Sequence, residues 1–86
     1  MKFLVAKSKF AAIATAKAEL QWEQVRQFEF LDLYRDPVRV ITNAAEMRGV
    51  KVEVVYLLPS FDDLNATQWE GFQSAFVSRK IKTVRL

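Results

Sequence analysis

The chain has 86 residues, of which 51% are hydrophobic and 13% aromatic, and its 13 basic and 10 acidic residues give a formal charge of +3. This composition argues against disorder, which goes with low hydrophobicity and high net charge, and the length predicts one domain over residues 1–86. The chain contains no Cys and no His, which excludes disulfides, thiolate nucleophiles, Cys/His zinc sites and His-dependent nucleophilic catalysis. We therefore expect no cofactor and no metal. Catalysis is disfavoured but stays open, since Asp, Glu, Lys, Tyr and Ser remain.

The apolar runs of the chain are far shorter than the roughly 20 residues that span a bilayer, so no membrane segment is expected. The N-terminus has some features of a secretory signal, with Lys2 before an apolar run and a small-residue stretch at 14–16. Lys7 and Lys9 interrupt the hydrophobic region that such a signal needs. The expected location is therefore cytoplasmic.

The first predicted elements are a buried strand over residues 3–6 and a helix from Lys9 to Leu20. Ser8 is placed to cap this helix, and its many alanines favour helical structure. The helix has no marked end before Val25, because no Gly or Pro stops it. Its apolar side is expected to carry Phe10, Ile13, Ala16 and Leu20.

The middle of the chain predicts a strand, a helix and a second strand. Residues 28–34 are aromatic and roughly alternating, which favours a strand. Asp36 and Pro37 have the pattern of an N-cap and first helical residue, and Gly49 is placed to close that helix in a left-handed conformation. Residues 50–58 form the strongest predicted strand.

The last part predicts a loop over residues 60–64, a helix starting at Asn65 or Thr67, and a strand over 81–86. Thr67 and Glu70 have the spacing of a capping box. The aromatic stripe of this helix has the spacing of a core face and consists of Trp69, Phe72 and Phe76.

Strict alternation of strands and helices predicts an α/β fold with a four-stranded, mostly parallel sheet and three helices. The expected strand order is 2-1-3-4, a flavodoxin-like arrangement, with the charged second and fourth strands at the edges. The first helix would then lie alone on one face and cover it poorly. A second copy or another protein would cover the remaining apolar surface, or the segment around Trp22 would fold over it.

Parallel sheets bind ligands beyond the carboxyl ends of their strands, where the strand order reverses. A candidate anion or phosphate site at this rim consists of Lys7, Ser8, Lys9, Arg35, Arg39, Ser60, Asp62 and Asp63. No glycine-rich phosphate loop is present, so an ordinary solvated rim is the stronger interpretation. The two adjacent aspartates are better explained as turn formers than as magnesium ligands or acid–base groups.

Basic residues gather at the two ends of the chain. Residues 1–18 hold four Lys and no acidic residue, residues 71–86 hold four basic and no acidic residue, and the segment between holds five basic and ten acidic residues. This asymmetry makes nucleic acid a candidate partner, through Arg79, Lys80, Lys82 and Arg85. The expected topology separates the two basic segments, which weakens this interpretation.

The favoured prediction is a small non-enzymatic binding or regulatory module that acts through protein–protein contact, as a homodimer or as an inhibitor of a partner. Trp22 and Phe61 are the candidate contact residues, because Phe61 lies in a loop with no periodic reason to be buried. The alternatives are a nucleic-acid-binding module using the basic ends and a phosphate-ligand domain using the strand-end rim.

Overall fold

The computed structural model describes all 86 residues, and its radius of gyration of 11.9 Å matches the value of about 12 Å for a compact folded domain of this length. Its elements are β1 (Lys2–Val5), α1 (Lys9–Ala18), β2 (Glu23–Arg26), β3 (Glu29–Leu31), β4 (Pro37–Ile41), η1 (Ala44–Met47), β5 (Val54–Leu57), η2 (Pro59–Asp63), α2 (Ala66–Ser78) and β6 (Lys82–Arg85), η being 3-10 helices. None of the helices has both the length and the apolar character that crossing a membrane requires.

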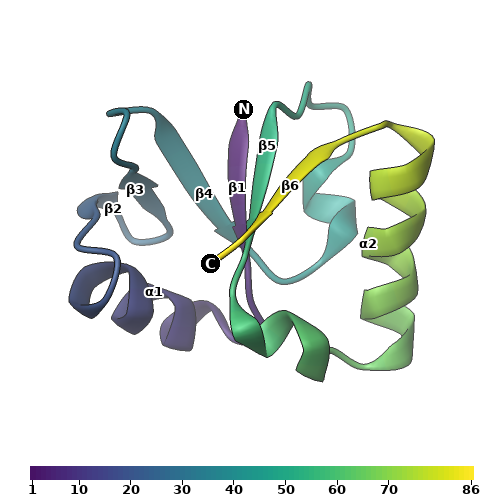
Figure 1. Cartoon of the computed structure of the whole chain (residues 1–86), viewed down its shortest axis with the longest axis horizontal. Coiled ribbons are helices and arrows are strands. Elements are labelled where there is room, and N and C mark those ends of the chain that lie inside the picture. Colours follow the sequence, from purple (N-terminus) through teal and green to yellow (C-terminus); the bar gives the residue numbers. More distant parts are fainter.

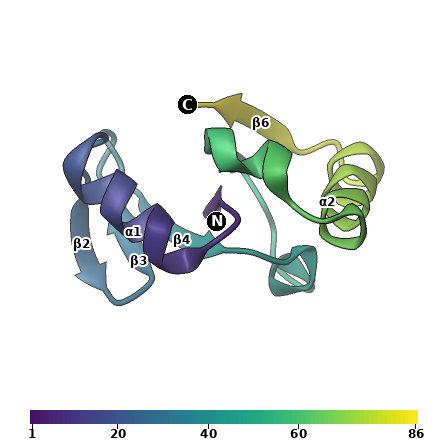
Figure 2. The ribbon, with the colours of Figure 1, turned by 90° about the horizontal axis from the view of Figure 1, so that it is seen from below.

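All six strands form one mixed sheet in the order β2-β3-β4-β1-β5-β6. Its centre is parallel, since β1 pairs with β4 and β5, and β5 pairs with β6. The β2–β3 hairpin extends the sheet antiparallel to β4. α1 lies against the half of the sheet that holds β2, β3 and β4 (Figure 1), and α2 lies on the other side of the molecule (Figure 2).

The predicted four-stranded, three-helix, flavodoxin-like fold is therefore wrong, and the largest error lies at residues 36–48. The expected helix is the strand β4 followed by the short 3-10 helix η1. Val38, Val40 and Ile41 are β-branched and fully or almost fully buried, which suits a strand between two neighbours better than a helix. Asp36 forms an ion pair with Lys2 rather than capping a helix.

Residues 28–34 also differ from the prediction. Only Glu29–Leu31 form a strand, which runs antiparallel to β4 as the second arm of a hairpin whose first arm is β2. Every residue of β2 is exposed, so this strand has no apolar alternation by which the sequence could reveal it. The edges of the sheet are consequently β2 and β6.

Several local predictions are confirmed and others are corrected. Ser8 caps α1, accepting a hydrogen bond from the Ala11 backbone at 3.3 Å, but the helix ends at Ala18 and buries Ala12 and Ala16 while Phe10 is exposed. Asn65 caps α2 and forms a capping box with Gln68, so the predicted capping box of Thr67 and Glu70 is wrong. Gly49 has the predicted left-handed φ of 75°, although it follows a 3-10 helix. β5 pairs in parallel with β1 on one side and with β6 on the other, as expected for the strands predicted over residues 3–6, 50–58 and 81–86.

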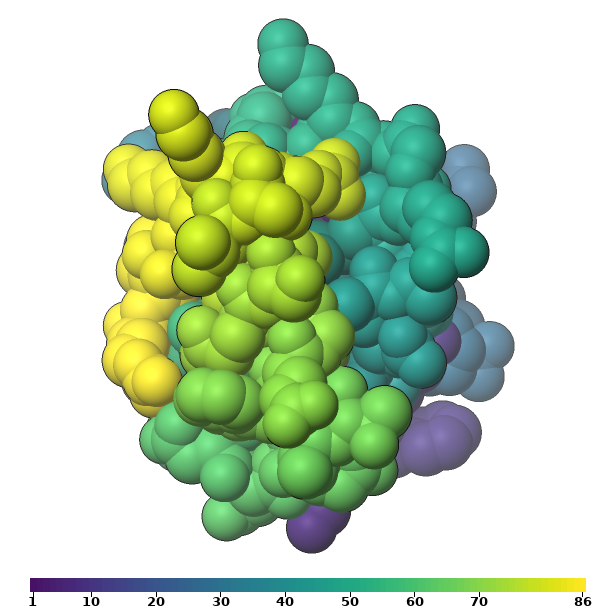
Figure 3. Space-filling model, turned by 90° about the vertical axis from the view of Figure 1, so that its right-hand side faces the viewer, coloured from purple at the N-terminus to yellow at the C-terminus, as the bar shows by residue number.

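The sheet separates two hydrophobic clusters. The α1 face buries Leu4, Ala6, Ala12, Ala16, Trp22, Phe30, Val38, Val40, Tyr56 and Leu58. The α2 face buries Phe3, Val5, Ile41, Met47, Val55, Leu57, Phe61, Leu64 and Phe72. α2 covers its side of the molecule, with β6 running along one flank of the helix (Figure 3).

Candidate functional site

The α1 face of the sheet is covered unevenly. α1 packs over the β4 side, while two hollows of about 420 and 390 Å³ lie on the side of β5 and β6. The first is lined by Lys2, Tyr34, Asp36, Val54, Tyr56, Lys82 and Val84. The second is lined by Glu19, Leu20, Trp22, Asp32, Leu33, Tyr34, Tyr56 and Leu86. Tyr34 and Tyr56 line both, so the loop that carries Tyr34 stands where the two hollows meet.

This loop, residues 32–36, is organised by its first side chain. The Asp32 carboxylate accepts hydrogen bonds through Oδ1 from the Tyr34 and Asp36 backbone N–H groups at 2.9 and 3.0 Å. The Asp32 N–H donates to the Asp36 carbonyl at 3.0 Å. Arg35 has a left-handed φ of 66°, which its neighbours' hydrogen bonds compensate. The aspartate thus closes the loop on itself.

The other carboxylate oxygen of Asp32 joins the loop to the sheet. Oδ2 accepts hydrogen bonds from Lys2 Nζ of β1 and from the Tyr56 hydroxyl of β5, both at 2.9 Å. Lys2 also pairs with Asp36 at 2.8 Å. The Asp32 side chain is only 1% exposed and that of Lys2 11%, and no buried side-chain polar atom lacks a partner. Because breaking a buried pair leaves an uncompensated charge, this network holds the loop firmly.

The network keeps its groups in single protonation states at neutral pH. Hydrogen bonding to Asp36 and Asp32 outweighs burial and raises the pKa of Lys2 above 10.5. Burial would raise the Asp32 pKa, but hydrogen bonds from Lys2, the Asp36 backbone and Tyr56 outweigh it and hold the pKa below 3.8. Burial and the hydrogen bond to Asp32 raise the pKa of Tyr56 above 10.0. A general acid or base works best with a pKa near the working pH, so these groups suit structure better than catalysis.

The fixed loop displays two large apolar side chains. Leu33 is 82% exposed and Tyr34 is 77% exposed, among the most exposed large hydrophobic residues of the chain. The Lys2 ammonium lies 5.0 Å from the centre of the Tyr34 ring, a cation–π distance that orients the ring over the sheet. Next to them, Trp22 packs edge-on against Tyr56 with ring centres 5.1 Å apart.

Sequence reasoning missed Lys2, Asp32, Leu33, Tyr34 and Tyr56 as members of one site. A signal was present in the spacing of Asp32 and Tyr34, because an aspartate side chain often accepts from the backbone two residues further on. That signal marks a turn, and the strand predicted over 28–34 concealed it. The partners Lys2 and Tyr56 come from distant strands, which only the sheet order brings together.

The structure divides the predicted strand-end rim. The Lys7 backbone donates to the Ser60 hydroxyl at 3.3 Å, so these two positions do meet. Lys9 lies 2.9 Å from Glu46, which satisfies its charge within the chain. For Glu46, burial would raise the carboxyl pKa, but the hydrogen bonds from Lys9 and the Thr42 backbone lower it.

The remaining rim residues lie apart from Lys7. Because β3 runs antiparallel to β4, the loop after it lies at the opposite end of the sheet, and Arg35 there pairs with Glu23 at 2.8 Å. Arg39 is in the middle of β4, opposite Glu29. Asp62 pairs with Arg85 at 3.3 Å, and Asp63 is exposed. Ser8 is used as the α1 cap.

The candidate contact residues Phe61 and Trp22 are both buried, with 0% and 7% of their surfaces exposed. Phe61 packs against Phe72 and Phe76, with ring centres 5.9 and 6.1 Å away. The loop position of Phe61 gave no sign of this burial because the partners come from α2. Trp22 does fold over part of the thinly covered face, which was the alternative considered for it.

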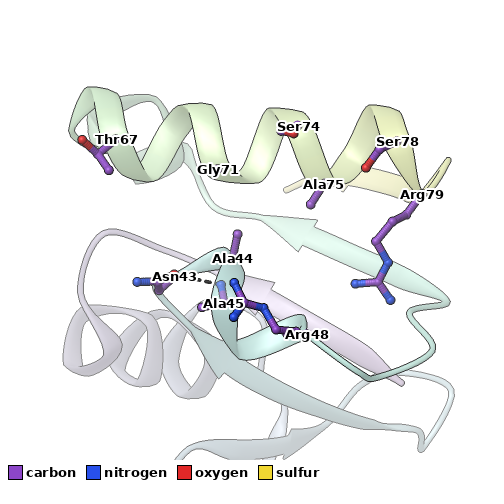
Figure 4. A pocket seen from close by; sticks show the side chains of 10 residues that line it. All are labelled: Asn43, Ala44, Ala45, Arg48, Thr67, Gly71, Ser74, Ala75, Ser78 and Arg79. Atoms are coloured by element: carbon purple, nitrogen blue, oxygen red, sulfur yellow. Dashed lines mark hydrogen bonds between the residues drawn. The ribbon is translucent and has the colours of Figure 1, made fainter.

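The predicted nucleic-acid residues have different surroundings. The Arg79 guanidinium donates to the Met47 carbonyl at 3.0 Å and to the Val50 carbonyl, so it ties α2 to the end of η1. Arg85 forms an ion pair with Asp62, while Lys80 and Lys82 are exposed and take part in no ion pair. A groove of about 490 Å³ lies between α2 and η1. Figure 4 shows its lining side chains, with Arg79 at one end.

That groove is lined mainly by small side chains. Gly71 approaches η1 closely, since a Cβ added there would lie 3.6 Å from the Ala44 Cβ. Asn43, on the same wall, already accepts a hydrogen bond from the Ala45 backbone at 2.8 Å (Figure 4). The only ionisable side chains that line the groove are the two arginines Arg48 and Arg79. The groove therefore reflects close helix packing and has no concentration of reactive groups.

Fold and site together define a small α/β domain in which a six-stranded mixed sheet separates two helices and presents an aromatic loop on its thinly covered face. Comparisons with protein-family models, with curated proteins and with solved structures give no match to this chain.

Proposed function

We propose that the chain is a non-catalytic binding module that contacts another protein through the surface around Leu33 and Tyr34. The observation that carries this proposal is the pair of exposed apolar side chains, 82% and 77% accessible, on a loop that the buried Asp32 network fixes. Single exposed hydrophobic residues are common on protein surfaces. Two adjacent ones on an ordered loop beside two hollows form a larger, prearranged surface.

The order of the loop matters for affinity. Binding costs free energy when loops and side chains lose freedom, and a loop already closed by hydrogen bonds has lost much of that freedom before the partner arrives. Tyrosine is also one of the residue types that contribute most to protein interfaces. The arrangement of Tyr34 over the sheet fits that role better than a role in the core.

A module of this kind would regulate or inhibit its partner by occupying a surface. A cytoplasmic location belongs to the same proposal, and cell fractionation would check it. The nucleic-acid alternative receives less support, because Arg79 is engaged with backbone carbonyls of the chain and Lys2 and Lys9 are held in ion pairs. The phosphate-ligand alternative receives less support because Arg35 lies at the opposite end of the sheet from Lys7.

The test is affinity capture from a nuclease-treated lysate of the source cells with three baits. These are the wild type, a Leu33→Ser/Tyr34→Ala double variant, and a Val77→Ser control that alters a residue 77% exposed on α2. We expect a protein captured at near-stoichiometric yield by the wild type and the control, and at least about tenfold less by the double variant, since loss of an interface centre costs more than about 1.4 kcal/mol.

Equal capture by all three baits would contradict the proposal, and so would capture that occurs only when the nuclease treatment is omitted. Sedimentation of the purified chain identifies a second copy as the partner if the wild type is a dimer and the double variant is a monomer. A wild-type monomer that captures a different chain identifies a heterologous partner.

A further inference from the structure

The open edge of β6 has a distinctive arrangement of backbone groups. Leu86 donates its N–H to the Leu57 carbonyl at 2.9 Å, and β6 runs parallel to β5. In a parallel ladder alternate residues bond to the same neighbour. Lys82, Val84 and Leu86 therefore bond toward β5, which leaves the N–H and C=O groups of Thr83 and Arg85 facing away from the sheet. No strand occupies that side.

The charged residues in the segment that contains β6 all have the same sign. Residues 79–86 contain Arg79, Lys80, Lys82 and Arg85 and no acidic residue. The opposite edge strand, β2, has one acidic and one basic residue in Glu23 and Arg26. Lysines on an edge strand also discourage pairing with other edges, and a second copy of β6 would bring like charges together. The edge therefore disfavours self-pairing and favours an acidic strand.

We infer that β6 binds an extended acidic segment of a partner protein, which adds to the sheet as a seventh strand. The inference rests on the proposed function and names the kind of partner segment involved. Strand addition takes its affinity from main-chain hydrogen bonds and its specificity from alternate side chains. The open groups of Thr83 and Arg85 supply the first, and the charges of Lys82 and Arg85 supply the second.

The register of the sheet defines what the added strand should carry. Lys82 and Val84 lie in the rows of Val54 and Tyr56, on the α1 face, while Thr83 and Arg85 lie in the rows of Val55 and Leu57, on the α2 face. Cross-strand neighbours stabilise a sheet when charges are opposite and when β-branched residues face each other. The expected core of the segment is Glu-Thr-Val-Glu, with the acidic residues opposite Lys82 and Arg85.

Two features make this edge accessible to such a segment. Lys82 is exposed and lines the hollow that also contains Tyr34 and Val84, so the added strand would border the proposed contact surface. The pair between Arg85 and Asp62 is exposed on both sides, with side chains 60% and 62% accessible. Exposed pairs contribute little, so Arg85 can exchange Asp62 for another carboxylate.

The experiment measures binding of fluorescent peptides to the full chain by anisotropy. The probe is a peptide with the Glu-Thr-Val-Glu core between Gly-Ser flanks. The controls are the same peptide with both glutamates replaced by lysines, and an acidic version N-methylated at alternate residues to remove its hydrogen-bond donors. The protein variants are Lys82→Glu and, as a matched charge reversal on the opposite edge, Arg26→Glu.

We expect the acidic peptide to bind with a Kd of about 1 mM or tighter. Lys82→Glu should weaken binding at least tenfold and Arg26→Glu less than about twofold, because only the former lies on the occupied edge. The lysine peptide and the N-methylated peptide should not bind. Hydrogen exchange of the Thr83 and Arg85 amides should slow by on the order of tenfold at saturation, since the new strand covers them.

Absence of binding by the acidic peptide would overturn the inference. Equal binding by the N-methylated peptide would also overturn it, since that result means charge attraction without strand pairing. Binding of a labelled single-stranded oligonucleotide that depends on Lys82, with no peptide binding, would assign the edge to nucleic acid instead.

Capture experiments separate this inference from the proposed function. If the Leu33→Ser/Tyr34→Ala variant loses the captured protein while Lys82→Glu retains it fully, the inference about β6 fails and the proposed function stands. If neither variant affects capture, both fail.

Discussion

On the α2 face of the sheet, Phe3, Phe61 and Phe72 are completely buried, and Phe61, Phe72 and Phe76 lie with their ring centres 5.8–6.1 Å apart. On the α1 face, small side chains of α1 cover one half, and the other half holds an ion-pair network beneath an exposed aromatic loop. The first face gains its stability from apolar area removed from water. On the α1 face, part of the apolar surface stays exposed to solvent on the loop of Leu33 and Tyr34. This is the arrangement expected of the proposed binding surface.

The first prediction tests the α2 face, where the buried aromatic rings lie, and has the largest expected effect on stability. Phe61→Ala should lower the free energy of unfolding by about 3–5 kcal/mol, because it removes a fully buried ring and leaves a cavity against Phe72. Urea unfolding measures the change. Phe10→Ala, which alters a ring 71% exposed on α1, should cost less than about 1 kcal/mol. Similar costs for both variants would contradict the contrast between the two faces.

The second prediction tests the network under the loop. Asp32→Ala should cost about 2–4 kcal/mol, because Lys2 and the Tyr56 hydroxyl lose a buried partner and two loop N–H groups lose their acceptor. The exchange of the Tyr34 amide should become faster as the loop opens. Asp36→Ala, which removes a carboxylate 53% exposed, should cost under about 1 kcal/mol. Unchanged exchange of the Tyr34 amide in Asp32→Ala would show that Asp32 does not hold the loop of residues 32–36 in place.

The third prediction concerns pH. The pKa of Asp32 is lowered, so its contribution to stability is present above the ordinary carboxyl value of 3.8 and is lost as the pH falls through its lower folded-state pKa. The pKa of Lys2 is raised, so its contribution is present below 10.5 and is lost as the pH rises above that value.

The urea midpoint measured from acid to alkaline pH should therefore fall at both ends. Asp32→Asn should flatten the acid limb, and Glu46→Gln should flatten it less, since the lowered pKa of Glu46 acts in the same range from a partly exposed position. An acid limb identical in wild type and Asp32→Asn would show that the carboxylate of Asp32 contributes no pH-dependent stability.

The smallest effect on stability is expected at the displayed residues. Tyr34→Ala should change the free energy of unfolding by no more than about 0.5 kcal/mol, because the ring is 77% exposed. Thermal and urea unfolding measure this, while the capture assay measures the effect on binding. A large loss of stability in Tyr34→Ala would mean that the ring contributes to the folded core. The contrast between the buried α2 face and the partly exposed α1 face would then no longer hold.

The predictions from sequence were most accurate for features that depend on near neighbours. The Ser8 cap, the left-handed conformation of Gly49 and the buried strand at the N-terminus follow from local hydrogen bonding, sterics and apolar patterning. They were least accurate between residues 23 and 48, where the predicted strand and helix are a hairpin, a loop and a central strand. There Asp36 and Pro37 imitate the start of a helix, while the choice of strand depends on pairing with β1 and β3.

The candidate site was less accessible to sequence reasoning than the fold. The rim predicted around Lys7 and Ser60 assumed that all strands point the same way, so the antiparallel β3 moved Arg35 to the other end of the sheet. Phe61 was expected at the surface because the sequence distance to Phe72 and Phe76 hides their contact. The network around Asp32 joins strands that are far apart in the chain.

By itself the sequence determined that this is an α/β chain with no thiol or imidazole chemistry, a first helix capped by Ser8 and a basic C-terminal strand. Only the tertiary structure decided that β4 is a strand, that Asp32 meets Lys2 and Tyr56, and that Leu33 and Tyr34 remain exposed. Caps and propensities act over a few neighbouring residues. Strand pairing and burial depend on partners that are distant in sequence, whose positions are set only when the whole sheet assembles.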